Sequence, residues 1–228
     1  MKTRVGVVHT FLYSVEDIKK QFASQLPDVE MINIIDDSLL QEALANQGLT
    51  PAIISRMGDY YRHCQDLGCA CVLNQCSSVG EAADIAATMI RIPVLKIDGP
   101  MAREAAGLGS RIAVIATAIS TVAPSSRLVE RMAADIGKPV EVERCFCQGA
   151  YEALLRENDR DKHNRIVIDT IEQAAARNDV IVLAQGSMYH LLPLLGHIQI
   201  PVLTSLESGV RQIKDYLADR AGKGGQVQ

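Results

Sequence analysis

The sequence contains no apolar segment near the roughly 20 residues that a membrane-spanning helix needs. It also lacks a basic run, and its formal net charge is −4, which argues against a nucleic acid or an anionic membrane as partner. Residues 1–4 lead directly into a strand pattern, without the apolar core of a signal peptide. We therefore expect a cytoplasmic protein whose partner is a small molecule.

Paired cysteine motifs are missing too. No C-x-x-C spacing occurs, and Cys69 and Cys71 lie inside a strand pattern, so we expect no metal site. Without a sign of secretion, we expect all the cysteines to be reduced. Gly107 and Gly109 are not followed by the third glycine of a dinucleotide-binding motif. The six cysteines of the chain are Cys64, Cys69, Cys71, Cys76, Cys145 and Cys147.

The chain instead contains one strand pattern twice. Apolar runs over residues 4–8, 29–35, 70–73 and 92–97 are echoed about 110 residues later, over 111–117, 140–142, 180–183 and 200–203. Continuous apolar runs between helical stretches are typical of parallel strands that are buried on both faces. We infer a duplicated α/β protein of two pseudo-symmetric, flavodoxin-like halves, each a four-stranded, mainly parallel sheet with flanking helices.

We expect the halves to span residues 1–108 and 109–206. A helix over residues 207–221 could pack on the first half, and the small, polar residues 222–228 are expected to be frayed.

Polar residues follow the strands at the points where ligands of such sheets bind. If the two halves face each other, these residues converge on one cleft, which is the predicted active site. The candidate residues are His9, Thr10, Asn74, Cys76, Ser77, Ser78, Thr117, Thr121, Gly186 and Ser187.

Cys76 is the predicted catalytic residue. It stands in a turn between an apolar run and a helical pattern that begins at Gly80. Backbone amides and the helix dipole at such a position favour thiolate over thiol, and Ser77 and Ser78 could hold a carboxylate beside it. The alternative is that Cys76 is a small buried hydrophobic residue.

These paired turns resemble those of the aspartate/glutamate racemase superfamily, which includes hydantoin racemases, maleate isomerases and arylmalonate decarboxylases. The resemblance covers nearly the whole chain. It implies a cofactor-independent enzyme that clamps a small carboxylate between its halves, and it implies a dimer or larger homo-oligomer. Cys76 matches the first catalytic cysteine of the racemases, and Thr117 and Thr121 match their carboxylate-binding threonines.

The second turn departs from the racemase pattern. The position that corresponds to Cys76 is Gly186, with no cysteine nearby. A proton from the opposite face then needs another acid, for which His9 and His190 are the alternatives. A lone thiol also suits decarboxylation of a malonate-like acid, or a carboxylate-binding protein without catalysis. The leading expectation is a racemase or isomerase of a small carboxylic acid or amino-acid derivative.

Overall fold

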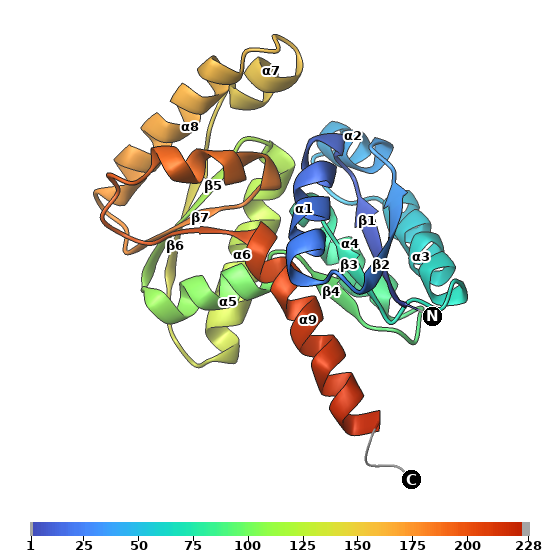
Figure 1. Cartoon of the computed structure of the whole chain (residues 1–228). Helices are drawn as coiled ribbons and strands as arrows, with labels where there is room; N and C mark the ends of the chain where they lie inside the picture. Colours follow the sequence, from blue (N-terminus) through green and yellow to red (C-terminus); the bar gives the residue numbers. More distant parts are fainter. Residues whose placement is uncertain (1, 225–228) are drawn as a thin grey trace. The chain divides into compact units, whose positions relative to one another are not determined.

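The computed structural model describes residues 2–224, which fold into two compact units. The first unit runs to Ile97 and resumes at Leu206, and the second spans Asp98–Ser205 (Figure 1). The sequence placed residues 98–108 in the first half, whereas the structure places them in the second, because the helix they form packs on α6 and β7. Of the segment expected to be frayed, residues 222–224 end the last helix, and 225–228 lie outside the described residues.

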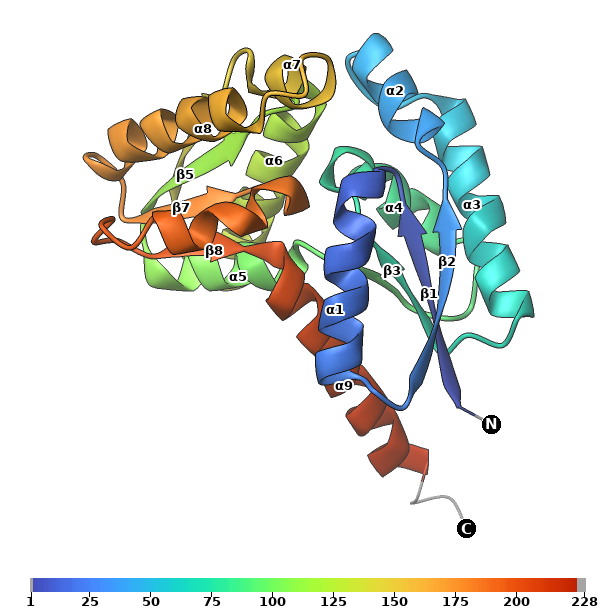
Figure 2. The ribbon, with the colours of Figure 1, turned by 45° about the horizontal axis from the view of Figure 1, so that its top comes forward.

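The first unit is built on a sheet of four parallel strands in the order β2-β1-β3-β4. Its elements are β1 (Thr3–His9), η1 (Leu12–Ser14), α1 (Val15–Gln25), β2 (Val29–Ile35), α2 (Ser38–Ala45), α3 (Pro51–Asp66), β3 (Cys71–Asn74), η2 (Ser77–Val79), α4 (Gly80–Ala87), β4 (Val94–Lys96) and α9 (Ser205–Gly224). Helices α2, α3 and α4 pack on one face, while α1 and α9 cover the other (Figure 2).

The second unit repeats the same order with its own four parallel strands, β6-β5-β7-β8. Its elements are α5 (Gly99–Leu108), β5 (Arg111–Ala116), α6 (Ile119–Asp135), β6 (Glu141–Phe146), α7 (Ala150–Leu155), α8 (Arg160–Ala175), β7 (Val180–Leu183), η3 (Gly186–Leu194) and β8 (Val202–Thr204). One hydrophobic core lies between the sheet and α5 and α6, and another lies under α7, α8 and η3. The predicted α/β duplication is confirmed, and both sheets are entirely parallel.

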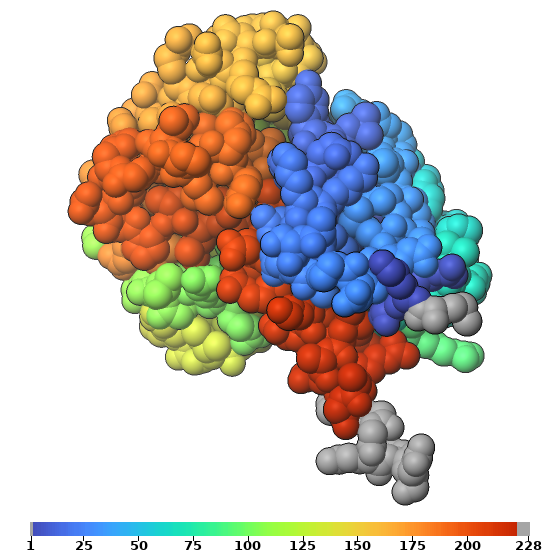
Figure 3. Space-filling view, in the orientation of Figure 1, coloured from blue at the N-terminus to red at the C-terminus, as the bar shows by residue number. Residues whose placement is uncertain are grey.

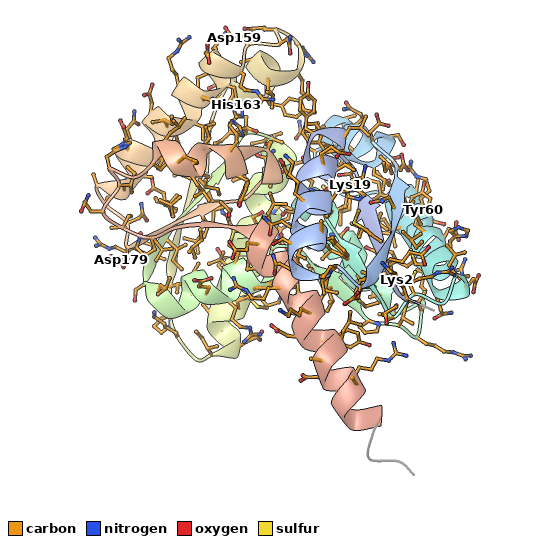
Figure 4. All side chains as sticks on the ribbon, in the orientation of Figure 1. Lys2, Lys19, Tyr60, Asp159, His163 and Asp179 are labelled. Atoms are coloured by element: carbon orange, nitrogen blue, oxygen red, sulfur yellow. The ribbon has the colours of Figure 1, made fainter. Side chains whose placement is uncertain are left out.

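Local signals explain several of these elements. Thr50 caps α3, since its Oγ1 accepts a hydrogen bond from the amide of Ile53 at 3.2 Å, and Pro51 follows in the first turn. Asp159 caps α8 in the same way, through the amide of Lys162 at 2.8 Å (Figure 4). Caps of this kind fix where each helix begins and hence where the preceding loop ends.

Helix α2 was not predicted from the sequence. It is only eight residues long, and short helices depend on tertiary packing for most of their stability. Leu39, Leu40 and Ala43 are buried on its inner side, and Glu42 is bonded to Thr50 and Arg56 of the α3 region. The contacts that stabilise α2 therefore come from residues outside it.

Helix α9 follows β8 in the chain and packs on the first unit. Its Gln212 side chain donates to the carbonyl oxygen of Lys96 at 2.7 Å, and Gln25 of α1 donates to the carbonyl oxygen of Glu207. At Gly209 the helix approaches Ile97 so closely that a Cβ atom would collide with the backbone. Helix α9 therefore belongs to the first unit (Figure 3). Within residues 2–224, no helix has the length and apolar character needed to cross a membrane.

Candidate active site

The Cys76 turn lies at the carboxyl edge of the first sheet and is held by internal hydrogen bonds. Beyond the last β1–β3 pair, the amide of Gln75 donates to the carbonyl oxygen of Val8 at 3.1 Å. The side-chain Nδ2 of Asn74 donates to the carbonyl oxygen of Cys76 at 2.9 Å, and its Oδ1 accepts from Tyr61 at 3.4 Å. Asn74 therefore positions the turn from inside the fold.

Several donors surround the sulfur of Cys76. They are the hydroxyls of Thr10 and Ser78 and the backbone amides of Ser78 and Val79. The amides come from the start of η2, as expected for a cysteine that immediately precedes a helical turn. The Thr10 hydroxyl lowers the pKa of Cys76, but its buried oxygen has no partner at hydrogen-bond geometry among the described residues. Polar groups from two separate strand ends thus lower the pKa of one thiol.

Burial nevertheless dominates the ionisation of this thiol. Cys76 is only 8% exposed, and the loss of solvation raises its pKa above the ordinary value of 9.0, although the surrounding donors act in the opposite direction. The sequence predicted that the helix start would favour thiolate. That contribution exists, but it is smaller than the cost of burying the charge.

His9 is also at this edge, at the end of β1, and its side chain is completely buried. Its Nε2 lies 2.8 Å from Oδ1 of Asn33, which only accepts hydrogen bonds, so Nε2 carries the proton. The Nδ1 atom is then a buried acceptor, with no partner in the described part of the chain. Burial lowers the pKa of His9, more than the Asn33 hydrogen bond raises it. In this neutral state His9 accepts a proton at Nδ1 and does not supply one there.

The remaining two candidates of the first unit differ in exposure. Ser78 is 4% exposed and directs both its hydroxyl and its amide to the sulfur of Cys76. Ser77 is half-buried in the same turn. The structure therefore brings Thr10, Cys76, Ser77 and Ser78 together.

In the second unit, Thr117 follows β5 and is fixed by a glutamine. The side-chain Oε1 of Gln185 accepts hydrogen bonds from the amides of Thr117 and Ala118, at 2.5 and 3.2 Å, and from the Thr117 hydroxyl at 3.1 Å. Gln185 directly precedes Gly186, the residue that corresponds to Cys76. Gln185 thereby links the turn after β7 to the turn after β5.

The other candidates of the second unit lie on the adjoining helices. Thr121 is buried in the first turn of α6, while Gly186 and Ser187 are half-buried at the start of η3. His190 also belongs to η3, and its Nε2 lies 3.0 Å from Oδ1 of Asn164 on α8.

Asn164 joins His190 to a second histidine. Its Oδ1 is also 3.0 Å from Nδ1 of His163, which Figure 4 labels on α8. The imidazole rings of His163 and His190 are stacked with centroids 6.2 Å apart. His190 is therefore tied to α8 through the same side-chain oxygen that holds His163.

The cysteines of the second unit do not replace the missing second thiol. Burial raises the pKa of Cys145 to about 12 and that of Cys147 to about 11. Both lie on or just after β6, which β5 separates from β7 in the sheet. All six cysteines are free thiols, and residues 2–224 contain no group of three His, Cys, Asp or Glu side chains arranged to hold a metal ion.

Two residues that hold candidate residues in place were not predicted from the sequence. The first is Gln185, for which a signal existed, because Gln75-Cys76-Ser77 and Gln185-Gly186-Ser187 repeat the same Gln-x-Ser pattern. The second is Asn33, whose signal is weaker: a polar residue within the otherwise apolar end of β2. Their partners, Thr117 and His9, are distant in sequence, so neither contact could be read from local pattern.

The fold is shared with solved enzymes. Glutamate racemase RacE1 from Bacillus anthracis is 16% identical, with a TM-score of 0.72 over 96% of this chain and 82% of that one. Aspartate racemase from Picrophilus torridus is 14% identical, with a TM-score of 0.67 over 93% and 94% of the two chains. A Gly74Cys mutant of arylmalonate decarboxylase is 16% identical, with a TM-score of 0.56 over 92% and 91%.

Among curated proteins, none matches this chain in sequence. The family model described as Asp/Glu/Hydantoin racemase, in contrast, matches residues 12–213. That match includes the Cys76 turn, the strands β2 to β8 and the first half of α9 up to Ile213. The chain belongs to the Asp/Glu/hydantoin racemase family.

Proposed function

We propose that this protein is a cofactor-independent racemase or isomerase of a small carboxylic acid or amino-acid derivative, with Cys76 as its base or nucleophile. The observation that carries the proposal is the position of Cys76 directly before η2, where the amides of Ser78 and Val79 and the hydroxyls of Ser78 and Thr10 lower the pKa of its thiol against the effect of burial. A thiol at a strand end that is buried only for packing has no need of these donors, whereas a thiolate formed during a reaction is stabilised by them.

In the proposed reaction, the Cys76 thiolate removes a proton from the carbon next to the substrate carboxylate. The Thr10 and Ser78 hydroxyls and the turn amides stabilise the thiolate before this step. The electron pair of the broken C–H bond moves onto the carboxylate as an enolate-like species, whose charge requires donors that are already in place. A proton from solvent then adds to the opposite face of the carbon, and Cys76 returns its proton to solvent. We assign carboxylate binding beside the thiol to Ser77 and Ser78. Thr117, Thr121 and Ser187 stand at the matching positions of the second unit and are proposed as further substrate-binding residues. His9, through Nδ1, would accept a hydrogen bond from the substrate.

The β7 turn favours a second candidate, decarboxylation of a malonate-like acid. Gly186 and Ser187 present no thiol, so the residues of this turn offer no obvious second acid of the racemase kind. In a decarboxylation, the C–C bond breaks, carbon dioxide leaves, and Cys76 as a thiol protonates the carbanion. One thiol is enough for this reaction. A third candidate is a carboxylate-binding protein that does not turn its ligand over.

Incubation of small chiral acids and substituted malonates in deuterated water separates these candidates. Deuterium incorporation without carbon dioxide supports racemisation or isomerisation, and carbon dioxide release supports decarboxylation. The key variant is Cys76→Ser, which we expect to abolish turnover. Cys145→Ser makes the same change outside the site and serves as the matched control. Full activity in Cys76→Ser would overturn the proposal, and ligand binding without exchange would leave the binding-protein alternative.

A further inference from the structure

A cavity of about 600 Å³ lies at the amino edge of the first sheet, away from the carboxyl edge that carries Cys76. Its wall comes from three parts of the first unit: the start of β1, the connection between α3 and β3, and the last turns of α9. Figure 4 labels Lys2 at the start of this strand, and Figure 3 shows α9 beside the N-terminal segment. The lining residues are Lys2, Thr3, Arg4, Leu67, Gly68, Ala70, Leu217, Arg220 and Ala221.

The charge of this cavity is positive, although the chain as a whole is acidic. Lys2, Arg4 and Arg220 line it, and none of its described lining residues is acidic. Glu30, which lies outside the lining, pairs with Arg4 at 2.9 Å and offsets one of the three charges. About two positive charges therefore remain for a ligand.

Both arginines are held in place by the connection between α3 and β3. Nη1 of Arg4 donates to the carbonyl oxygen of Leu67 at 3.2 Å, and Nη1 of Arg220 donates to that of Ala70 at 3.4 Å. Tyr216 reaches the same Ala70 oxygen at 3.3 Å. In the described part of the chain, Nε and Nη2 of Arg220 have no hydrogen-bond partner. An anchored guanidinium with donors to spare is suited to bidentate recognition of an anion.

The size and the apolar part of the wall restrict the ligand further. A cavity of this volume is within the range of small-molecule sites and is larger than a bare inorganic anion requires. Leu67, Leu217 and Ala221 provide apolar surface next to the cations. The chemistry therefore suits a compact organic molecule that carries a dianionic group.

We propose that this cavity is a second ligand site, which binds a small organic dianion through Arg220, Arg4 and Lys2. The dianion is a phosphate monoester or a dicarboxylate, since both present two negative charges to a guanidinium. The site lies at the opposite edge of the sheet from Cys76. The molecule that binds there is therefore not the substrate of the reaction proposed for Cys76. A ligand there would join the last turns of α9 to the start of β1.

The test is a titration of the isotope-labelled full chain, followed by backbone amide NMR at low salt. The probes are glucose 6-phosphate, succinate and, as an uncharged match, glucose. We expect saturable shifts at Thr3, Gly68 and Ala70 with at least one dianion and none with glucose. The probe that saturates identifies the phosphate or the dicarboxylate as the source.

Two matched variants on α9 assign the binding. Arg220→Gln removes a lining cation and should weaken binding by about tenfold, the loss expected for one charge-assisted contact. Arg211→Gln makes the same change at an exposed position of the same helix, outside the cavity, and should leave binding unchanged. Lys2→Gln provides a second lining variant if Arg220→Gln disturbs the fold.

Three outcomes would overturn the proposal: shifts that do not saturate, equal weakening by Arg220→Gln and Arg211→Gln, or shifts confined to residues 74–80. The last outcome would mean that the anion binds at the Cys76 turn alone. Since the measurement does not depend on turnover, failure here and failure of the proposed enzymatic activity can be distinguished.

Discussion

Gln185 Oε1 lies 2.5 Å from the amide nitrogen of Thr117 and joins the turns that follow β7 and β5. The corresponding residue of the first unit, Gln75, likewise reaches the segment after β1, where its Nε2 donates to Ser14 at 2.8 Å. The duplicated sheets therefore share one device, in which a glutamine after the third strand holds the chain after the first. The direction of the hydrogen bonds differs between the two units, since the Gln185 side chain accepts them and the Gln75 side chain donates one.

Replacement of Gln185 tests this device. Gln185→Ala leaves the amides of Thr117 and Ala118 without their acceptor and should cost about 1–3 kcal/mol of unfolding free energy. We also expect kcat/KM on an identified substrate to fall, because Thr117 loses its fixed position. Gln173→Ala, at an exposed position of α8, is the control and should be neutral in both measurements. Unchanged stability and activity in Gln185→Ala would show that the contact is dispensable.

The raised pKa of Cys76 predicts the pH profile of the reaction. If thiolate is the reactive form, kcat/KM should increase with pH through the alkaline range, because burial keeps the thiol protonated near neutrality. Thr10→Val removes a donor and should move the profile to higher pH, whereas Thr10→Ser keeps the hydroxyl and should restore it. A profile that is flat above pH 7 in the unmodified protein contradicts this assignment.

We expect the free energy of unfolding to fall in acid because two histidines are buried in the folded protein. Burial lowers the pKa of His9 and of His163, so the unfolded chain binds protons more readily than the folded one. The neutral, buried histidines contribute fully to the free energy of unfolding above about pH 6.5. This contribution is lost as the pH falls toward their pKa in the folded protein. Each can contribute up to about 1.4 kcal/mol per pH unit in that window.

Urea unfolding at pH 7.5 and 5.5 measures this loss. His163→Gln should reduce the difference between the two pH values, while His63→Gln, at an exposed position of α3, should not. An equal effect of the two substitutions would mean that burial of His163 is not the cause.

The contacts of Arg56 at the carboxyl edge of the first sheet are expected to contribute to the stability of the fold. It bonds to Asp36 at 3.1 Å, to Ser38 at 2.7 Å and to Glu42. Burial alone would raise the pKa of Asp36, but hydrogen bonds from Ser38 and Tyr60 and the charge of Arg56 together lower it. This stabilisation is present above about pH 4 and is lost as the pH falls further.

Arg56→Met leaves two half-buried carboxylates without their cation and should cost about 1–3 kcal/mol, measured by urea unfolding at pH 7. Arg62→Met, on the same helix, breaks only an exposed pair with Asp59 and should change stability by less than about 0.5 kcal/mol. If the two variants unfold alike, Arg56 does not hold α2 in place.

Much of the fold was predictable because buried parallel strands have a local signature. The apolar runs ending at Val8, Leu73 and Leu183 identify strands whatever surrounds them, and their repetition identifies the duplication. Helix α2 and the assignment of residues 98–108 to the second unit were not predictable, since both depend on packing against distant elements. The Cys76 turn was found because strand, turn and helix adjoin in the sequence.

The sequence by itself determined that a cysteine stands between the third strand and the next helix, and that no cysteine stands at Gly186. Only the tertiary structure decided the protonation of that cysteine, because solvation depends on the whole surroundings of the sulfur. It also decided which nitrogen of His9 carries the proton, through Asn33 on the neighbouring strand. Sequence order fixes which groups are present, whereas the free energy of a charge depends on distances and burial, which arise only when remote strands pair.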